Sequence, residues 1–164
     1  MEALIEWLLS TQLSDFVLTY RWAWPIAETV HFVGLVLLFG SIATFDFRVL
    51  GVGMGIAPRA VHRLVPFGVL GFCLSALTGF AFISGTPDQY FYNWAFYGKV
   101  TFLVVMGLNA IYFYSCIYAE IKTLGPYDSA SRLAKVSACV SLIAMVAIMC
   151  CGRMLTFFRP PGPF

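Results

Sequence analysis

The sequence predicts an all-α fold: an antiparallel bundle of four transmembrane helices with an amphipathic interfacial helix at its N-terminus. Hydrophobic residues make up 60% of the 164 residues and charged residues only 11%, which is too apolar for a soluble monomer. Four apolar runs, each long enough to cross about 30 Å of hydrocarbon, alternate with polar or glycine-rich stretches. We therefore expect an interfacial helix (1–20), a four-helix transmembrane domain (21–158) and a C-terminal tail (159–164).

The first segment has apolar residues at helical spacing, with acidic residues and Ser10 on the opposite face. It is too polar to span a membrane and suits a helix lying on the surface. It also lacks a basic region and a small-residue cleavage site, so we expect no cleavable signal peptide. Its apolar residues are Leu4, Ile5, Leu8, Leu9, Leu13, Phe16 and Val17.

Four spans follow, separated by stretches whose composition favours turns or interfacial loops. Glycine and proline fill 51–58, aromatic and polar residues fill 85–99, and a turn-rich stretch covers 124–132. The expected spans are 25–49, 64–84, 100–119 and 135–158.

Small residues recur every three or four positions on two of these spans. Such stripes let membrane helices approach closely, so each should face another helix. The stripes are Gly71, Ser75 and Gly79 on the second span, and Ser137, Ser141 and Ala144 on the fourth.

The first span carries three ionisable residues, Glu28, His31 and Asp46. Such residues are costly at membrane depth and are candidates for function. At about 100° per residue they share one helix face, with Glu28 and His31 one turn apart and Asp46 about 22 Å further along.

Antiparallel threading brings the start of the first span level with the end of the fourth. Glu28 and His31 can then lie near soft sulfur ligands and a guanidinium, while His62 lies at the other membrane surface beside basic residues. The fourth-span group is Met149, Cys150, Cys151, Arg153 and Met154, and the basic group is Arg48, Arg59 and Arg63.

This arrangement favours haem b, for which a histidine supplies an axial ligand and arginines neutralise propionates. Two bis-histidine haems would need four histidines, and the chain has two, so a symmetric oligomer or a methionine would complete the coordination. The expected metal ligands are His31, His62 and Met154. The wider cofactor site comprises His31, Glu28, Arg153, His62, Arg48, Arg63 and Met149.

Copper is the alternative cofactor, because histidine with methionine or cysteine suits Cu(I). A purely structural reading also stands: Glu28 pairs with Arg153, and His31 is a hydrogen-bonded imidazole that holds helices in register. On that reading His62 contacts lipid headgroups and Asn109 joins two helices.

Several stretches, among them WPIAETVHFVGLVLLFGSIATFDFRVLG, GLNAIYF and GRM, resemble an uncharacterised family of small bacterial membrane proteins catalogued as a domain of unknown function. The likeness runs from about Trp22 to Met154. It implies a four-helix integral membrane protein and no assigned activity. Family members often place a histidine shortly after the LNA element, where this chain has Tyr112, Phe113 and Tyr114. The plan is also similar, at the level of fold, to membrane b-type cytochromes.

The basic residues predict the orientation. Six flank the turns after the first and third spans, and four lie on the other side, so both termini should be periplasmic in a bacterial inner membrane. A net charge of +2 gives no support for a nucleic-acid partner. The six are Arg48, Arg59, Arg63, Lys122, Arg132 and Lys135, and the four are Arg21, Lys99, Arg153 and Arg159.

We therefore expect a haem b protein that transfers electrons within or across the membrane, as a homo-oligomer or in a larger complex. The first alternative is a non-enzymatic accessory or scaffold subunit. The second is a small copper or proton-coupled transporter using Glu28, Asp46 and Asn109. No nucleotide-binding loop, Ser/His/Asp arrangement or zinc motif is present in the sequence.

Overall fold

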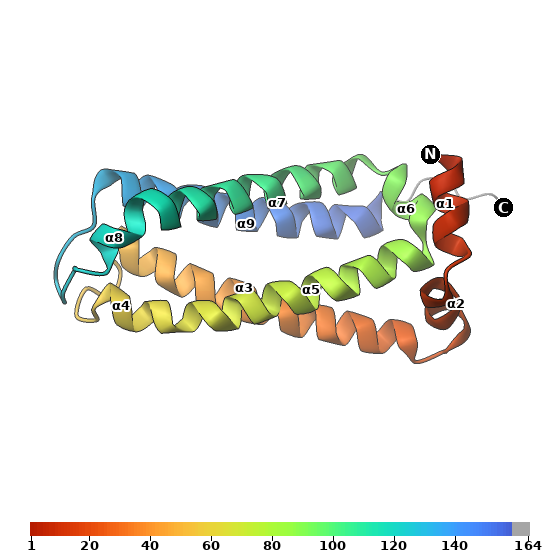
Figure 1. The fold of residues 1–164 in the computed structure, drawn as a ribbon, viewed down its shortest axis with the longest axis horizontal. Helices are drawn as coiled ribbons and strands as arrows, with labels where there is room; N and C mark the ends of the chain where they lie inside the picture. Colours follow the sequence, from red (N-terminus) through yellow and green to blue (C-terminus); the bar gives the residue numbers. More distant parts are fainter. Residues whose placement is uncertain (159–164) are drawn as a thin grey trace.

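The long helices pair into two antiparallel hairpins in the computed structural model, which describes residues 1–158 (Figure 1). Within those residues, four helical stretches are long and apolar enough to cross a membrane, so the predicted multi-pass, all-α bundle is confirmed. The predicted tail, 159–164, lies outside the described residues. The first hairpin consists of α3 (Ala23–Leu50), α4 (Pro58–Val61), η1 (His62–Leu64) and α5 (Val65–Gly85). The second consists of α7 (Trp94–Tyr112), η2 (Phe113–Ile117), α8 (Tyr118–Ile121) and α9 (Arg132–Phe157).

The N-terminal segment forms two short helices, α1 (Glu2–Leu9) and α2 (Gln12–Thr19), where the sequence predicted one. The chain breaks between them because the Thr11 side chain caps α2 by accepting a hydrogen bond from the Ser14 amide. Both helices lie across one end of the bundle (Figure 1). We call this the α2 end, and the opposite end, which carries α4 and α8, the α4 end.

The stretch 85–99, predicted as a loop, contains α6 (Pro87–Phe91) and the first six residues of α7. The prediction was wrong about where the third span begins. Asn93 caps α7 by accepting from the Ala95 amide, and its side-chain amide donates to the carbonyl oxygens of Leu155 and Phe158 at the end of α9. Lys99 is consequently a helix residue inside the bundle rather than a loop residue.

The small-residue stripe on α5 packs against another helix, as predicted, and the structure shows that this helix is α3. A Cβ atom at Gly34 of α3 would lie 2.8 Å from the carbonyl oxygen of Gly71, and one at Gly71 would lie 2.6 Å from the Leu38 amide. Ser75 adds a hydrogen bond to the His31 carbonyl oxygen across the same contact. The two backbones touch here, and only glycine allows that distance.

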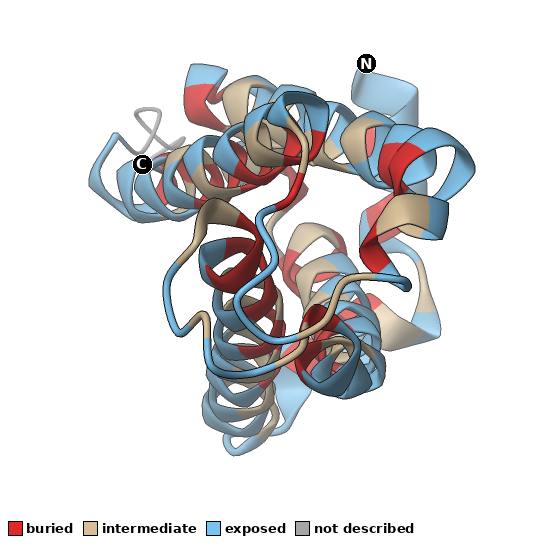
Figure 2. Cartoon of the chain, turned by 90° about the vertical axis from the view of Figure 1, so that its left-hand side faces the viewer, coloured by how far each residue is buried: buried red, intermediate tan, exposed pale blue. Residues whose placement is uncertain are grey.

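The two hairpins meet mainly at the α4 end. The apolar core cluster joins Phe45 and Val49 of α3 to Phe113 of η2 and to Ala134 and Ala138 of α9. Figure 1 shows α3 approaching α9 at this end and running away from it toward the α2 end. Figure 2, seen from the α4 end, shows the buried residues on helix faces turned toward neighbouring helices. The α9 stripe Ser137, Ser141 and Ala144 is buried, as the sequence predicted.

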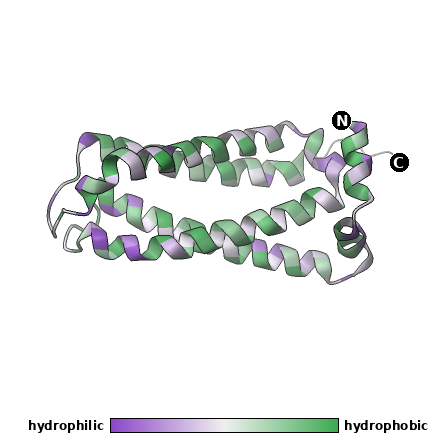
Figure 3. Cartoon of the chain, in the orientation of Figure 1, coloured by the Kyte–Doolittle hydropathy of each residue, from purple (hydrophilic) through white to green (hydrophobic). Residues whose placement is uncertain are grey.

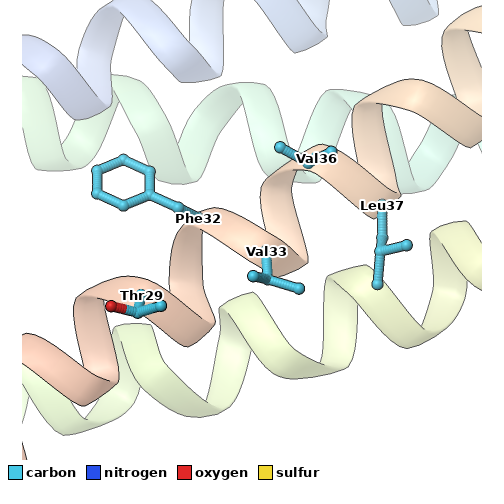
Figure 4. Close-up of a pocket in the computed structure, with 5 residues that line it drawn as sticks. All are labelled: Thr29, Phe32, Val33, Val36 and Leu37. Atoms are coloured by element: carbon cyan, nitrogen blue, oxygen red, sulfur yellow. The ribbon is translucent and has the colours of Figure 1, made fainter.

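The outer surface of the bundle is apolar, and hydrophilic residues gather toward its two ends (Figure 3). A shallow apolar hollow on the outward face of α3 is lined by side chains with only one polar atom, the Thr29 hydroxyl, which donates to the Pro25 carbonyl (Figure 4). Such a surface suits lipid chains and not a polar ligand. The hollow is lined by Thr29, Phe32, Val33, Val36 and Leu37.

Candidate functional site

His31 lies on α3 between the two helices of the first hairpin, toward the α2 end. Its Nδ1 atom is 2.8 Å from the Thr78 hydroxyl of α5, and the Phe82 ring packs edge-on with centroids 5.5 Å apart. A Cβ atom at Gly79 would lie 3.9 Å from the His31 Cε1 atom. The imidazole is therefore held by α5 on the side of its Nδ1 atom.

The proton position on His31 depends on the Thr78 hydroxyl, which lies 2.8 Å from both His31 Nδ1 and the Leu74 carbonyl oxygen. When the hydroxyl donates to Leu74, it accepts from Nδ1, and the lone pair of the imidazole then lies on Nε2. Within residues 1–158, Nε2 has no hydrogen-bond partner. An imidazole whose other nitrogen donates to an oriented partner is the usual arrangement of a metal-ligating histidine.

Lys99 of α7 is the residue that sequence reasoning missed. Its ammonium lies close enough to the His31 imidazole and the Cys151 thiol to interact with both electrostatically. A Cβ atom at Gly152 would lie 3.9 Å from Nζ, and one at Gly98 would lie 3.2 Å from the Cys151 sulfur. The positive charge is thus held on the side of the second hairpin that faces His31. The sequence signal was the Asn93 cap, which starts α7 before Lys99.

Glu28 and Arg153 each bond within their own helix. The Trp24 indole donates to Glu28 Oε1 at 3.0 Å, and Arg153 donates to the Thr156 hydroxyl at 3.3 Å. Both residues are exposed. Burial, and then the negative charge of Glu28, raise the pKa of Tyr90, in α6, to about 12. The suggested Glu28 and Arg153 ion pair is replaced by these two local bonds.

The sulfur groups of α9 divide between its inner and outer faces. Met149, Cys150 and Met154 are exposed on the surface, whereas Cys151 is buried. Met149 and Met154 were expected as ligands, but their outward position directs them toward lipid or another chain. Cys151 is the sulfur group that the fold brings toward Lys99 and the interior.

His62 lies in η1 at the α4 end, and tyrosines of the second hairpin hold both of its ring nitrogens. Nε2 is 3.0 Å from the Tyr114 hydroxyl, and Nδ1 is 3.3 Å from the Tyr118 hydroxyl. The rings of Tyr118 and Phe45 pack on the imidazole with centroids 4.5 and 5.5 Å away. The π-helical turn of η2 sets the positions of the two tyrosines. Ligation through His62 would require one of these hydrogen bonds to break.

The arginines expected near His62 have other contacts or point away. Arg48 is buried and donates to the carbonyl oxygens of Ile56 and Gly125, in the loops after α3 and α8. Arg63 and Arg59 are exposed on the surface. Arg48 therefore joins two loops, and Arg59 and Arg63 are the exposed arginines open to an anionic group.

Asn109 joins α7 to α9, as the structural reading predicted. Its amide donates to the Ser137 carbonyl oxygen at 3.0 Å, and the Ser137 hydroxyl donates back to Asn109 Oδ1 at 2.9 Å. Both polar groups of the amide are used, which leaves Asn109 no role as a ligand in this arrangement.

No group of three or more His, Cys, Asp or Glu side chains that could hold a metal ion occurs in the described part of the chain. Any metal at His31 would therefore take its remaining ligands from a prosthetic group, solvent or a second chain. Comparison with family models, curated proteins and solved structures finds no match to this chain.

Proposed function

We propose that this protein binds haem b at the α2 end of the bundle, with His31 as an axial ligand, and transfers electrons within the membrane. The observation that supports this proposal is the unpartnered Nε2 lone pair of His31, on an imidazole whose Nδ1–H is oriented by Thr78. A neutral imidazole held in this way is the donor that a b-type haem requires.

The surroundings of His31 suit the rest of such a group. Lys99 supplies a positive charge facing His31 that can offset a propionate carboxylate. Haem, when bound, supplies a one-electron iron couple. The chain's own residues hold the imidazole, exclude water through an apolar surface and offset the carboxylate charge.

His31 is the only histidine at this end, and Met149 and Met154 are exposed, so neither a second histidine nor these methionines completes the coordination inside one chain. We therefore propose a homo-oligomer or a larger membrane complex as the functional form. We further propose that the α2 end faces the periplasm of a bacterial inner membrane, because six of the ten basic residues flank the other end.

The deciding experiment is an absorption spectrum of the purified protein in lipid nanodiscs. We expect a Soret band and a reducible α band that are lost in His31→Ala and kept in His62→Gln, because phenols engage both nitrogens of His62. Metal analysis separates haem iron from copper. A folded, colourless wild-type protein without metal would exclude this function, and equal loss in both variants would reject the assignment to His31.

One observation favours an accessory subunit as the second candidate. The small-residue stripes of α5 and α9 are used within the chain, but Gly40 of α3 and Gly107 of α7 face outward, with nothing within 4 Å of an added Cβ atom. Small outward residues allow another membrane helix to approach. Stoichiometric co-purification of a partner chain without haem, lost in Gly107→Leu, would favour this function over the cytochrome.

A further inference from the structure

Asp46 is the most deeply buried carboxyl group described. It lies on α3 where this helix meets α9, it is 6% exposed, and its Oδ2 atom has no hydrogen-bond partner within residues 1–158. The hydroxyl of Ser141 on α9 is the polar group beside it. A buried polar atom without a partner is uncommon and calls for a physical explanation.

The cations around Asp46 are committed elsewhere. Arg48, two residues along α3, donates to the loop carbonyl oxygens of Ile56 and Gly125. His62, which packs on the neighbouring Phe45, bonds to two phenols. Lys135, at the start of α9, donates to the Ser129 hydroxyl. A charged carboxylate at Asp46 would therefore be buried without an ion-pair partner, which is strongly unfavourable.

A bound proton removes this difficulty, whereas a metal ion does not. A hard cation would need about six oxygen ligands, and here the carboxyl has one hydroxyl beside it. Ser41, the only serine of α3, is buried and packs toward Gly68 of α5. A protonated carboxyl needs only one acceptor. The Ser141 hydroxyl directs its hydrogen to the Met145 sulfur at 3.9 Å, so its oxygen is the acceptor beside Asp46.

We propose that Asp46 is a proton-binding site, whose protonated carboxyl donates to Ser141 and so joins α3 to α9. Ser137, one turn before Ser141, is bonded to Asn109 of α7. With the proton on Asp46, polar side-chain contacts therefore link α3, α9 and α7. Loss of the proton leaves a bare charge where the hairpins meet and drives them apart to admit water. This proposal does not depend on haem at His31.

The test uses full-length protein in nanodiscs and dicyclohexylcarbodiimide, an apolar reagent that adds to protonated carboxyl groups in membranes. Labelled peptides are identified by mass spectrometry in a Glu28→Gln background, because Glu28 is the other carboxyl of this span. Infrared difference spectra in H₂O and D₂O report the C=O stretch of a protonated acid. The variants are Asp46→Asn, which keeps shape and hydrogen bonding, and Asp128→Asn, an exposed control.

We expect labelling at Asp46 that decreases as pH rises, and a protonated-acid band lost in Asp46→Asn but kept in Asp128→Asn. We also expect Asp46→Asn to fold and to hold its hairpins together at a pH where the wild type separates. Absence of both the label and the band would overturn the proposal. Protection by Na⁺ at constant pH would overturn it too, since Asp46 would then bind a metal cation.

Discussion

The α4 and α2 ends of the bundle hold the same two hairpins in different ways. At the α4 end, the apolar cluster around Phe45 and Phe113, the His62 hydrogen bonds and the Arg48 bond to Gly125 all cross between hairpins. At the α2 end, His31 bonds within its own hairpin and faces a cation of the other. The contacts at the α4 end thus join the two hairpins, whereas at the α2 end the Nε2 atom of His31 has no hydrogen-bond partner among the described residues. The two histidines of this chain therefore have different hydrogen-bond environments.

The largest effect is expected from a substitution that disrupts the α3 and α5 hairpin, which carries both histidines. A Gly71→Leu side chain would collide with the backbone of α3, where an added Cβ atom already lies 2.6 Å from the Leu38 amide. We expect more than about 3 kcal/mol of destabilisation, enough to prevent accumulation of folded protein. Gly107→Leu, where nothing lies within 4 Å, is the control. Yield and gel-filtration profiles in detergent measure the difference, and equal behaviour would refute the α3 and α5 contact.

Two phenylalanines of equal burial, one near each end, test whether the two ends of the bundle differ in how they hold the hairpins together. Phe113 and Phe82 are each 9% exposed, but Phe113 packs across the hairpins and Phe82 within one. Phe113→Ala should cost about 3–5 kcal/mol of unfolding free energy. It should also increase the distance between probes on α3 and α9, as measured by spin-label spectroscopy. Phe82→Ala should leave that distance unchanged. A similar separation in both variants would mean that the ends do not differ.

The hydrogen-bond partners of the two histidines should differ in their effect on cofactor binding. Thr78→Val removes the acceptor that orients His31, and loss of such a partner typically weakens metal binding about 10–100-fold. Tyr114→Phe removes a partner of His62 and should leave haem affinity unchanged, with a stability loss of about 0.6 kcal/mol. Haem titration of the two apoproteins measures the haem affinity of each variant. Equal affinities in the two variants would contradict the role assigned to Thr78.

The smallest expected effect concerns Tyr90 at the α2 end. Its pKa is raised from 10.0 to about 12, so the folded state binds this proton more tightly than the unfolded state. The resulting stability is fully present below pH 10 and is lost as pH rises toward about 12. Thermal unfolding midpoints should therefore fall more steeply in this window for the wild type than for Tyr90→Phe. Parallel curves would show that Tyr90 is not coupled to folding.

Much of the fold follows from local sequence patterns. Apolar run length gives the four spans, and the spacing of Gly71 and Ser75 gives the face of α5 that meets α3. His31 was a candidate because an ionisable group inside an apolar run is costly. These features depend on one helix at a time, so a single sequence suffices to predict them.

The remaining features depend on how separate helices line up. The phenols around His62 could not be predicted, because the π-helical turn of η2 rotates Tyr114 and Tyr118 from the positions of a regular helix. Lys99 was placed in a loop because aromatic residues near a membrane surface suit loops and helix ends equally well. The exposure of Met149 and Met154 depends on the rotation of α9, which its sequence does not fix.

The Arg48 contact also constrains how the protein is made. Its guanidinium, on the first span, donates to the Gly125 carbonyl oxygen, 77 residues later in the chain. At translation rates of about 5–20 residues per second, this acceptor is synthesised about 4–15 s after Arg48. The first hairpin therefore leaves the ribosome with the Arg48 bond to Ile56 already possible and its bond to Gly125 still to be formed. This link between the two hairpins can form only after the third span and the loop that follows α8 have been made.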